Sequence, residues 1–63
     1  MTTNNAPLNV LIIDDDEAIL YTLQLRLESL GYTVWTADTA ASGISTFRRV
    51  HPDVVLLDIR LPD

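Results

Sequence analysis

Two short apolar runs, one near each end of the chain, do most to limit what it can fold into. They are Val10–Ile13, with the sequence VLII, and Val54–Leu57, with the sequence VVLL. Neither run alternates between apolar and polar residues, as a strand with one face in water would. Short runs rich in Val, Ile and Leu are typical of strands buried on both faces. We therefore predict two buried strands in a parallel sheet whose faces are covered by helices.

The residues after the first run change to a helical period. Their apolar side chains follow helical spacing and form one stripe along a helix. Asp15 or Asp16 is the expected N-cap, Glu17 suits the positive end of the helix, and Gly31 suits the left-handed position after its last turn. The stripe consists of Ile19, Leu20, Leu23, Leu27 and Leu30.

A further strand and a second helix are predicted before the second apolar run. Residues 32–37, YTVWTA, have the composition of a strand. Residues 38–50 return to a helical pattern, with Asp38 or Thr39 as the expected N-cap and Gly43 as a point of close packing between helix and strand. The sequence His-Pro-Asp then ends the helix, because a residue before proline avoids helical angles. The apolar side of this helix consists of Ala40, Gly43, Ile44, Phe47 and Val50.

The resulting order, strand-helix-strand-helix-strand, predicts an α/β fold with a three-stranded parallel sheet. Helices between strands imply right-handed crossovers. These crossovers allow the strands to follow one another in sequence order, or to reverse and put the first strand in the middle. The periodicity alone leaves both orders open.

Acidic residues at the strand ends favour the second order. Asp14 and Asp15 follow the first apolar run, and Asp58 follows the last. The carboxyl ends of parallel strands share one edge of the sheet, and ligand sites lie there where the strand order reverses. If the two strands are neighbours, the three carboxylates converge, and the economical order is 2-1-3. Such a group repels itself unless it is protonated or neutralised by a cation, and Mg²⁺ is the natural choice for oxygen ligands.

Size and charge exclude several classes of protein. The chain has 63 residues, no cysteine, a hydrophobic fraction of 48% and a formal net charge of −5. It is one domain at most, and it has no disulfides or thiolate metal sites. The negative charge disfavours direct binding to nucleic acid or to anionic membranes. Residues 1–7 are expected to be a disordered tail rather than a signal peptide, no segment is long enough to cross a membrane, and a cytoplasmic location is expected.

The sequences VLIIDDD and PDVVLLDIRLPD together resemble the first half of a response-regulator receiver domain, the phospho-acceptor module of two-component signalling. The resemblance covers residues 8–63 and implies half of a flavodoxin-like fold, whose full strand order is 2-1-3-4-5. It implies that Asp58 is the aspartate that takes a phosphoryl group from a histidine kinase. Asp14, Asp15, Asp58 and the backbone carbonyl of Arg60 would bind Mg²⁺. In such a protein the domain is a self-phosphorylating acceptor rather than an enzyme in the usual sense.

The family pattern continues beyond what these 63 residues contain. It adds two more strands, a Ser or Thr after the fourth and a Lys after the fifth, and the chain has no lysine. The expectation is therefore a truncated receiver with impaired phosphorylation. Its third strand would have an open edge, and open edges pair with other chains, so we predict a homodimer through that strand or an intertwined oligomer. The alternative function is a half-receiver that takes no phosphate and serves only for dimerisation or protein interaction.

Two other functions fit less well. A haloacid-dehalogenase-like phosphatase also has two acids spaced by one residue after a strand, as Asp14 and Asp16 are, but Glu17 and Ala18 do not continue its motif. A dinucleotide-binding fold needs glycine in the first turn, where this chain has acids that would repel a pyrophosphate. Asp16 and Glu17 are better explained as helix capping.

Overall fold

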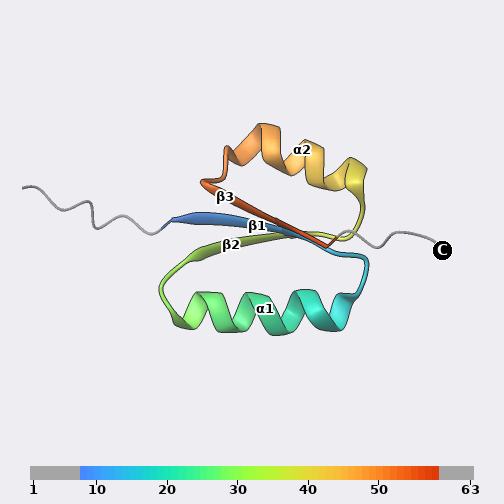
Figure 1. Ribbon diagram of the computed structural model, residues 1–63. Helices are drawn as coiled ribbons and strands as arrows, with labels where there is room; N and C mark the ends of the chain where they lie inside the picture. The colour runs from blue at the N-terminus through green and yellow to red at the C-terminus, as the bar shows by residue number, and fades with distance from the viewer. Residues whose placement is uncertain (1–7, 59–63) are drawn as a thin grey trace, which may run out of the picture.

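The computed structural model describes residues 8–58, which form a sheet with one helix on each face (Figure 1). The predicted tail, residues 1–7, and the predicted ligand Arg60 lie outside the described residues. In chain order the elements are β1 (Asn9–Ile13), α1 (Glu17–Ser29), β2 (Thr33–Ala37), α2 (Ala40–Val50) and β3 (Val54–Leu57).

The sheet is parallel throughout, and its order is β2-β1-β3. The first strand is therefore central, with Val10 opposite Val34 on one side and opposite Val54 on the other. This confirms the predicted α/β half-fold of the flavodoxin-like type and the strand order 2-1-3. It also brings the ends of β1 and β3, which are far apart in sequence, to one edge of the sheet.

The core lies around β1. Leu11 has no exposed surface and Ile12 is 2% exposed. On the α1 face, Val10 and Ile12 pack with Leu20 and Val34, and three partly buried side chains surround this cluster, namely Leu23, Leu27 and Tyr32. On the other face α2 contacts β1 and β2. The apolar run of β1 is buried on both faces, as predicted.

The helix ends follow local sequence signals. Asp16 is the N-cap of α1, and its Oδ1 accepts the N–H groups of Ala18 at 2.9 Å and Ile19 at 3.3 Å. Thr39 is the N-cap of α2 and forms a capping box with Ser42. Gly31 has the left-handed φ of 98° that was expected after α1. Each cap satisfies backbone donors or acceptors that a helix leaves without partners at its ends.

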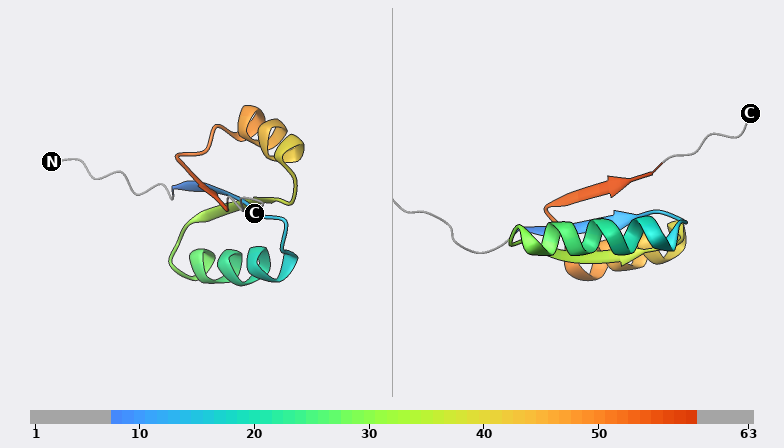
Figure 2. Two further views of the ribbon diagram at one scale, coloured as in Figure 1. Left: turned by 45° about the vertical axis from the view of Figure 1, so that its right-hand side comes forward. Right: turned by 90° about the horizontal axis from the view of Figure 1, so that it is seen from below.

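The prediction that the last apolar run is buried on both faces is wrong for the described residues. Within residues 8–58 neither helix contacts β3, and the side chains of Val54–Leu57 are between 38% and 56% exposed. Figure 2 shows the reason: α1 and α2 both lie over β1 and β2, and β3 projects beyond them. Parts of the predicted helix stripes are exposed with it, namely Ile19, Leu30, Ile44 and Phe47.

The close approach of α2 to β1 gives a test of this packing. A Cβ added at Gly43 would lie 2.5 Å from Cδ1 and 3.0 Å from Cγ1 of Ile13. We expect Gly43→Val to lower the free energy of unfolding by about 1–3 kcal/mol, the usual cost of overpacking. Urea denaturation followed by circular dichroism measures this change.

Ser45→Val is the matched control for that variant. It introduces the same side chain into α2 at an exposed position. Equal midpoints for the two variants would mean that Gly43 does not set the distance between α2 and β1.

Candidate functional site

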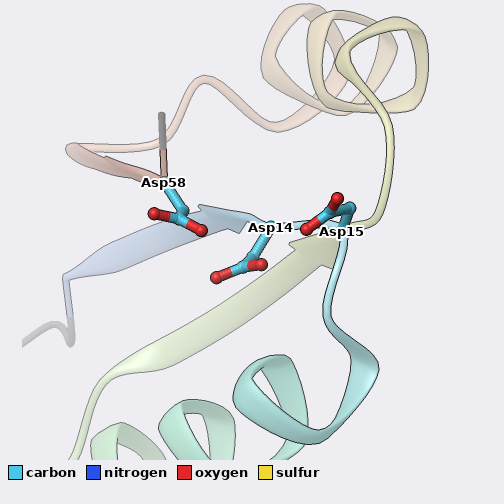
Figure 3. A group of neighbouring side chains, drawn as sticks. All are labelled: Asp14, Asp15 and Asp58. Carbon is cyan, nitrogen blue, oxygen red and sulfur yellow. The ribbon is translucent and has the colours of Figure 1, made fainter. Parts of the chain in front are cut away.

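Three carboxylates meet at the carboxyl edge of the sheet. Asp14 and Asp15 follow β1 and Asp58 follows β3, and one oxygen from each of the three lies within 4.8 Å of the other two. In Figure 3 the three side chains gather at one place, with Asp14 drawn between Asp58 and Asp15. The structure therefore brings together the acids that the sequence analysis grouped, and their roles as ligands and acceptor stay predictions.

Asp14 is the buried member of the group, at 5% exposed. Its backbone N–H donates to the carbonyl of Ala37 at the end of β2, at 3.1 Å. Its Oδ1 accepts the backbone N–H of Asp16 at 2.9 Å. Asp14 is thus held by both its backbone and its side chain, and the same contact places Asp16 where it caps α1.

Asp15 and Asp58 are exposed members of the group. The backbone N–H of Asp58 donates to the carbonyl of Ile13 at 3.1 Å, which extends the contact between β3 and β1 by one residue past the strand. The acceptor predicted from the sequence is therefore positioned by backbone pairing with the residue that precedes Asp14.

The group borders an open hollow of about 320 Å³. Asp38 and Thr39, which the sequence analysis treated only as capping candidates, also line this hollow. Thr39 does cap α2, and Asp38 adds a carboxylate to the rim without belonging to the three-carboxylate group. The sequence carried no local signal that Asp38 and Thr39 line the hollow, because the loop after β2 lies near the three carboxylates only when β2 pairs with β1 in the folded sheet.

The donor set suits a hard divalent cation. Carboxylate oxygens are the ligands that Mg²⁺ prefers, and it binds through one or two of them together with waters and phosphate oxygens. Three carboxylates this close repel one another, and a cation between them removes that repulsion. The residues present therefore fit Mg²⁺.

Comparison with known proteins identifies the family. The family model for "Response regulator receiver domain" matches residues 10–63. The chain belongs to the response regulator receiver domain family. Receivers of this family are modules of two-component systems, as the resemblance implied. None of the helices within residues 8–58 is long and apolar enough to cross a membrane.

Several longer proteins resemble this receiver. Transcriptional regulatory protein KdpE of Mycobacterium tuberculosis (strain CDC 1551 / Oshkosh) is 46% identical over 54 residues, covering 86% of the chain and 24% of that protein. Transcriptional regulatory protein GlrR of Escherichia coli (strain K12) is 38% identical over 60 residues, covering 95% of the chain and 14% of that protein. Cell cycle transcriptional regulator CtrA of Caulobacter vibrioides (strain NA1000 / CB15N) is 39% identical over 56 residues, covering 89% of the chain and 24% of that protein. The chain thus spans less than a quarter of the length of each of these relatives.

Substitutions can distinguish the predicted role of Asp15 from that of its neighbour Asp16. Asp15→Asn removes a charged oxygen from the group, so we expect the Mg²⁺ dissociation constant to rise by about tenfold or more, equivalent to about 1.4 kcal/mol of binding free energy. Asp16→Asn keeps a good N-cap and lies outside the group, so the constant should stay within about twofold of the wild type, a change of about 0.4 kcal/mol. Isothermal titration calorimetry measures both dissociation constants. Equal weakening of Mg²⁺ binding in the two variants would contradict the prediction that Asp15 is a ligand and Asp16 only a helix cap.

Proposed function

We propose that the chain is the phospho-acceptor part of a two-component response regulator, with Asp58 as the acceptor. The observation that carries this proposal is the convergence of Asp58 with Asp14 and Asp15 within 4.8 Å. Membership of the receiver family supports it, and the two sequence motifs that carry the resemblance contain the three acids. No single acid would carry the proposal, because carboxylates are common at strand ends and helix caps.

Asp58 acts as the nucleophile in this proposal. One of its carboxylate oxygens forms a bond to phosphorus while the bond from phosphorus to an imidazole nitrogen of a kinase's phosphohistidine breaks. The electron pair of the broken bond stays with the imidazole, and the product is an aspartyl phosphate, a covalent species that carboxylate nucleophiles form. Because Asp58 is exposed at the edge of the sheet, a donor on another protein can approach it.

Asp14 and Asp15 hold the cation in the same proposal, and the backbone carbonyl of Arg60 joins them as a ligand. Bound there, Mg²⁺ supplies positive charge that offsets the carboxylates and the incoming phosphoryl oxygens. The protein's own contribution is placement: buried Asp14 is fixed by two hydrogen bonds, and exposed Asp15 faces the hollow.

The partner in this proposal is a histidine kinase, and the expected location is the cytoplasm. Three of the similar proteins are named transcriptional regulators. We extend the proposal to a signalling role that leads to control of transcription.

Labelling by a small phosphodonor tests the acceptor. Incubation with acetyl phosphate and Mg²⁺ should add about 80 Da, the mass of one phosphoryl group, and the adduct should be stable in acid and labile in base. Intact-mass spectrometry measures it. Asp58→Asn should abolish the adduct because the amide oxygen is a much weaker nucleophile than a carboxylate.

Asp16→Asn is the control for that labelling, since it removes one acid nearby and keeps the cap of α1. It should label as the wild type does. An adduct retained in Asp58→Asn would show that another residue is the acceptor, and absence of any adduct in the folded wild type would reject the acceptor function.

A second candidate function is dimerisation through β3, and the exposure of that strand favours it. Val54–Leu57 are apolar and exposed, and an open groove of about 500 Å³ runs between β3 and α1. Ile19 and Leu23 line its helix side, and Leu56 lines its strand side. Exposed apolar strands at a sheet edge pair readily with another chain. We propose that two copies meet here about a two-fold axis, whether or not Asp58 takes phosphate.

Sedimentation across a dilution series tests the dimer. Leu56→Lys places a charge in the exposed strand, so we expect the dimer dissociation constant to rise by about tenfold or more, equivalent to about 1.4 kcal/mol. Leu25→Lys makes the same change at an exposed position of α1 and should leave the constant unchanged, since Leu25 does not line the groove. A folded wild type that stays monomeric at all concentrations would reject this candidate.

A further inference from the structure

The position of β3 along β1 is weakly specified by its own side chains. All four residues of β3 are apolar and all are exposed, and within residues 8–58 the strand contacts β1 but neither helix. A strand with one apolar and one polar face resists slipping, because a shift of one residue would exchange the two faces. In β3 both faces are alike, so a slipped register would bury almost the same surface. Something other than the pattern of side chains has to set the register.

A pair of hydrogen bonds at the start of β3 can fix its register along β1. The backbone N–H of Asp53 donates to the carbonyl of Asn9 at 2.8 Å. The backbone N–H of Asn9 donates in return to Oδ2 of Asp53, also at 2.8 Å, across 44 positions of sequence. The second bond depends on a side-chain oxygen of Asp53, which a substitution can remove without changing the backbone. Together the two bonds form a reciprocal clamp between the residue before β3 and the first residue of β1.

The geometry of the site makes the register matter. A shift of one residue moves a strand by about 3.3 Å and turns each side chain to the opposite face of the sheet. The oxygens of Asp14, Asp15 and Asp58 lie within 4.8 Å of one another. A slip of that size would therefore remove Asp58 from the group while leaving Asp14 and Asp15, which follow β1, where they are.

We infer that Asp53 is a positioning residue, whose carboxylate locks β3 in the register that brings Asp58 to the other two acids. It lies at the opposite end of β3 from Asp58 and acts only through the strand. Its consequence for cation binding and phosphoryl transfer rests on the proposed function, whereas its effect on the register does not. The sequence carries no local signal for this role of Asp53, because the partner of its carboxylate is a backbone group distant in the chain.

Amide hydrogen exchange by NMR separates this role from a general loss of stability. The Asp58 N–H is bonded to Ile13 on the β3 side of β1, and the Asp14 N–H is bonded to Ala37 on the β2 side. Asp53→Ala removes the acceptor of the clamp. We expect the exchange rate of the Asp58 amide relative to that of Asp14 to rise by about three- to tenfold, the range that one net hydrogen bond supports.

Two further variants complete the test. Asp53→Asn keeps an acceptor oxygen and should restore the wild-type ratio of exchange rates. Glu28→Ala removes one acid from the last turn of α1, away from β3, and should leave the ratio unchanged. An unchanged ratio in folded Asp53→Ala, or equal acceleration of both amides, would overturn the inference. If Asp53→Ala does not fold, Asp53→Asn decides: a folded protein with the wild-type ratio supports the clamp, and failure to fold or a raised ratio rejects it.

A second measurement connects the clamp to the site. Mn²⁺ binding, followed by the relaxation of water protons, should weaken by about three- to tenfold in Asp53→Ala, matching the loss of one net hydrogen bond, and should recover in Asp53→Asn. Unaltered Mn²⁺ affinity in Asp53→Ala with a raised exchange ratio would reject the link from register to site. If wild-type protein neither binds Mn²⁺ nor reacts with acetyl phosphate, the proposed function fails, and the exchange ratio still decides whether Asp53 sets the register.

Discussion

The central position of β1 is the constraint on which the rest of the structure depends. Its side chains are buried against a helix on each face, and its backbone pairs with a strand on each side. A strand held in this way has a rigid carboxyl end, and Asp14 and Asp15 follow that end directly. The dense negative charge after the most apolar segment is therefore placed by the burial of that segment, which supplies the free energy to hold two carboxylates side by side.

Consecutive acids in this chain have different contacts. Asp14 and Asp15 leave the sheet toward Asp58, whereas Asp16 turns to the first N–H groups of α1. A hydrogen bond from the Asp16 backbone to the Asp14 side chain links the two arrangements. The site and the start of the helix are thus built together, so a substitution at Asp14 would disturb both, while a conservative change at Asp16 affects only the cap.

The most exposed strand precedes Asp58, the carboxylate that we propose as the acceptor. Asp58 follows β3, which neither helix covers within residues 8–58, and its register depends on backbone pairing and on the clamp from Asp53 to Asn9. The same exposure that makes β3 a candidate dimer surface leaves Asp58 dependent on a few hydrogen bonds. In the proposed dimer, pairing of β3 with a second copy and assembly of the three-carboxylate group would be coupled, since anything that orders β3 also holds Asp58 in place.

The sequence by itself determined the order of elements and the grouping of the three acids, and it narrowed each helix N-cap to two residues, because periodicity, capping residues and strand-end charges are local signals. The structure selected Asp16 and Thr39 as the N-caps. The sequence even indicated the strand order, since three carboxylates at one edge are meaningful only if β1 lies beside β3. The exposure of the β3 side chains and the role of Asp53 were decided only by the tertiary structure. An apolar run reads the same whether or not a helix covers it, and a hydrogen bond between Asp53 and Asn9 exists only once 44 positions of chain have folded back.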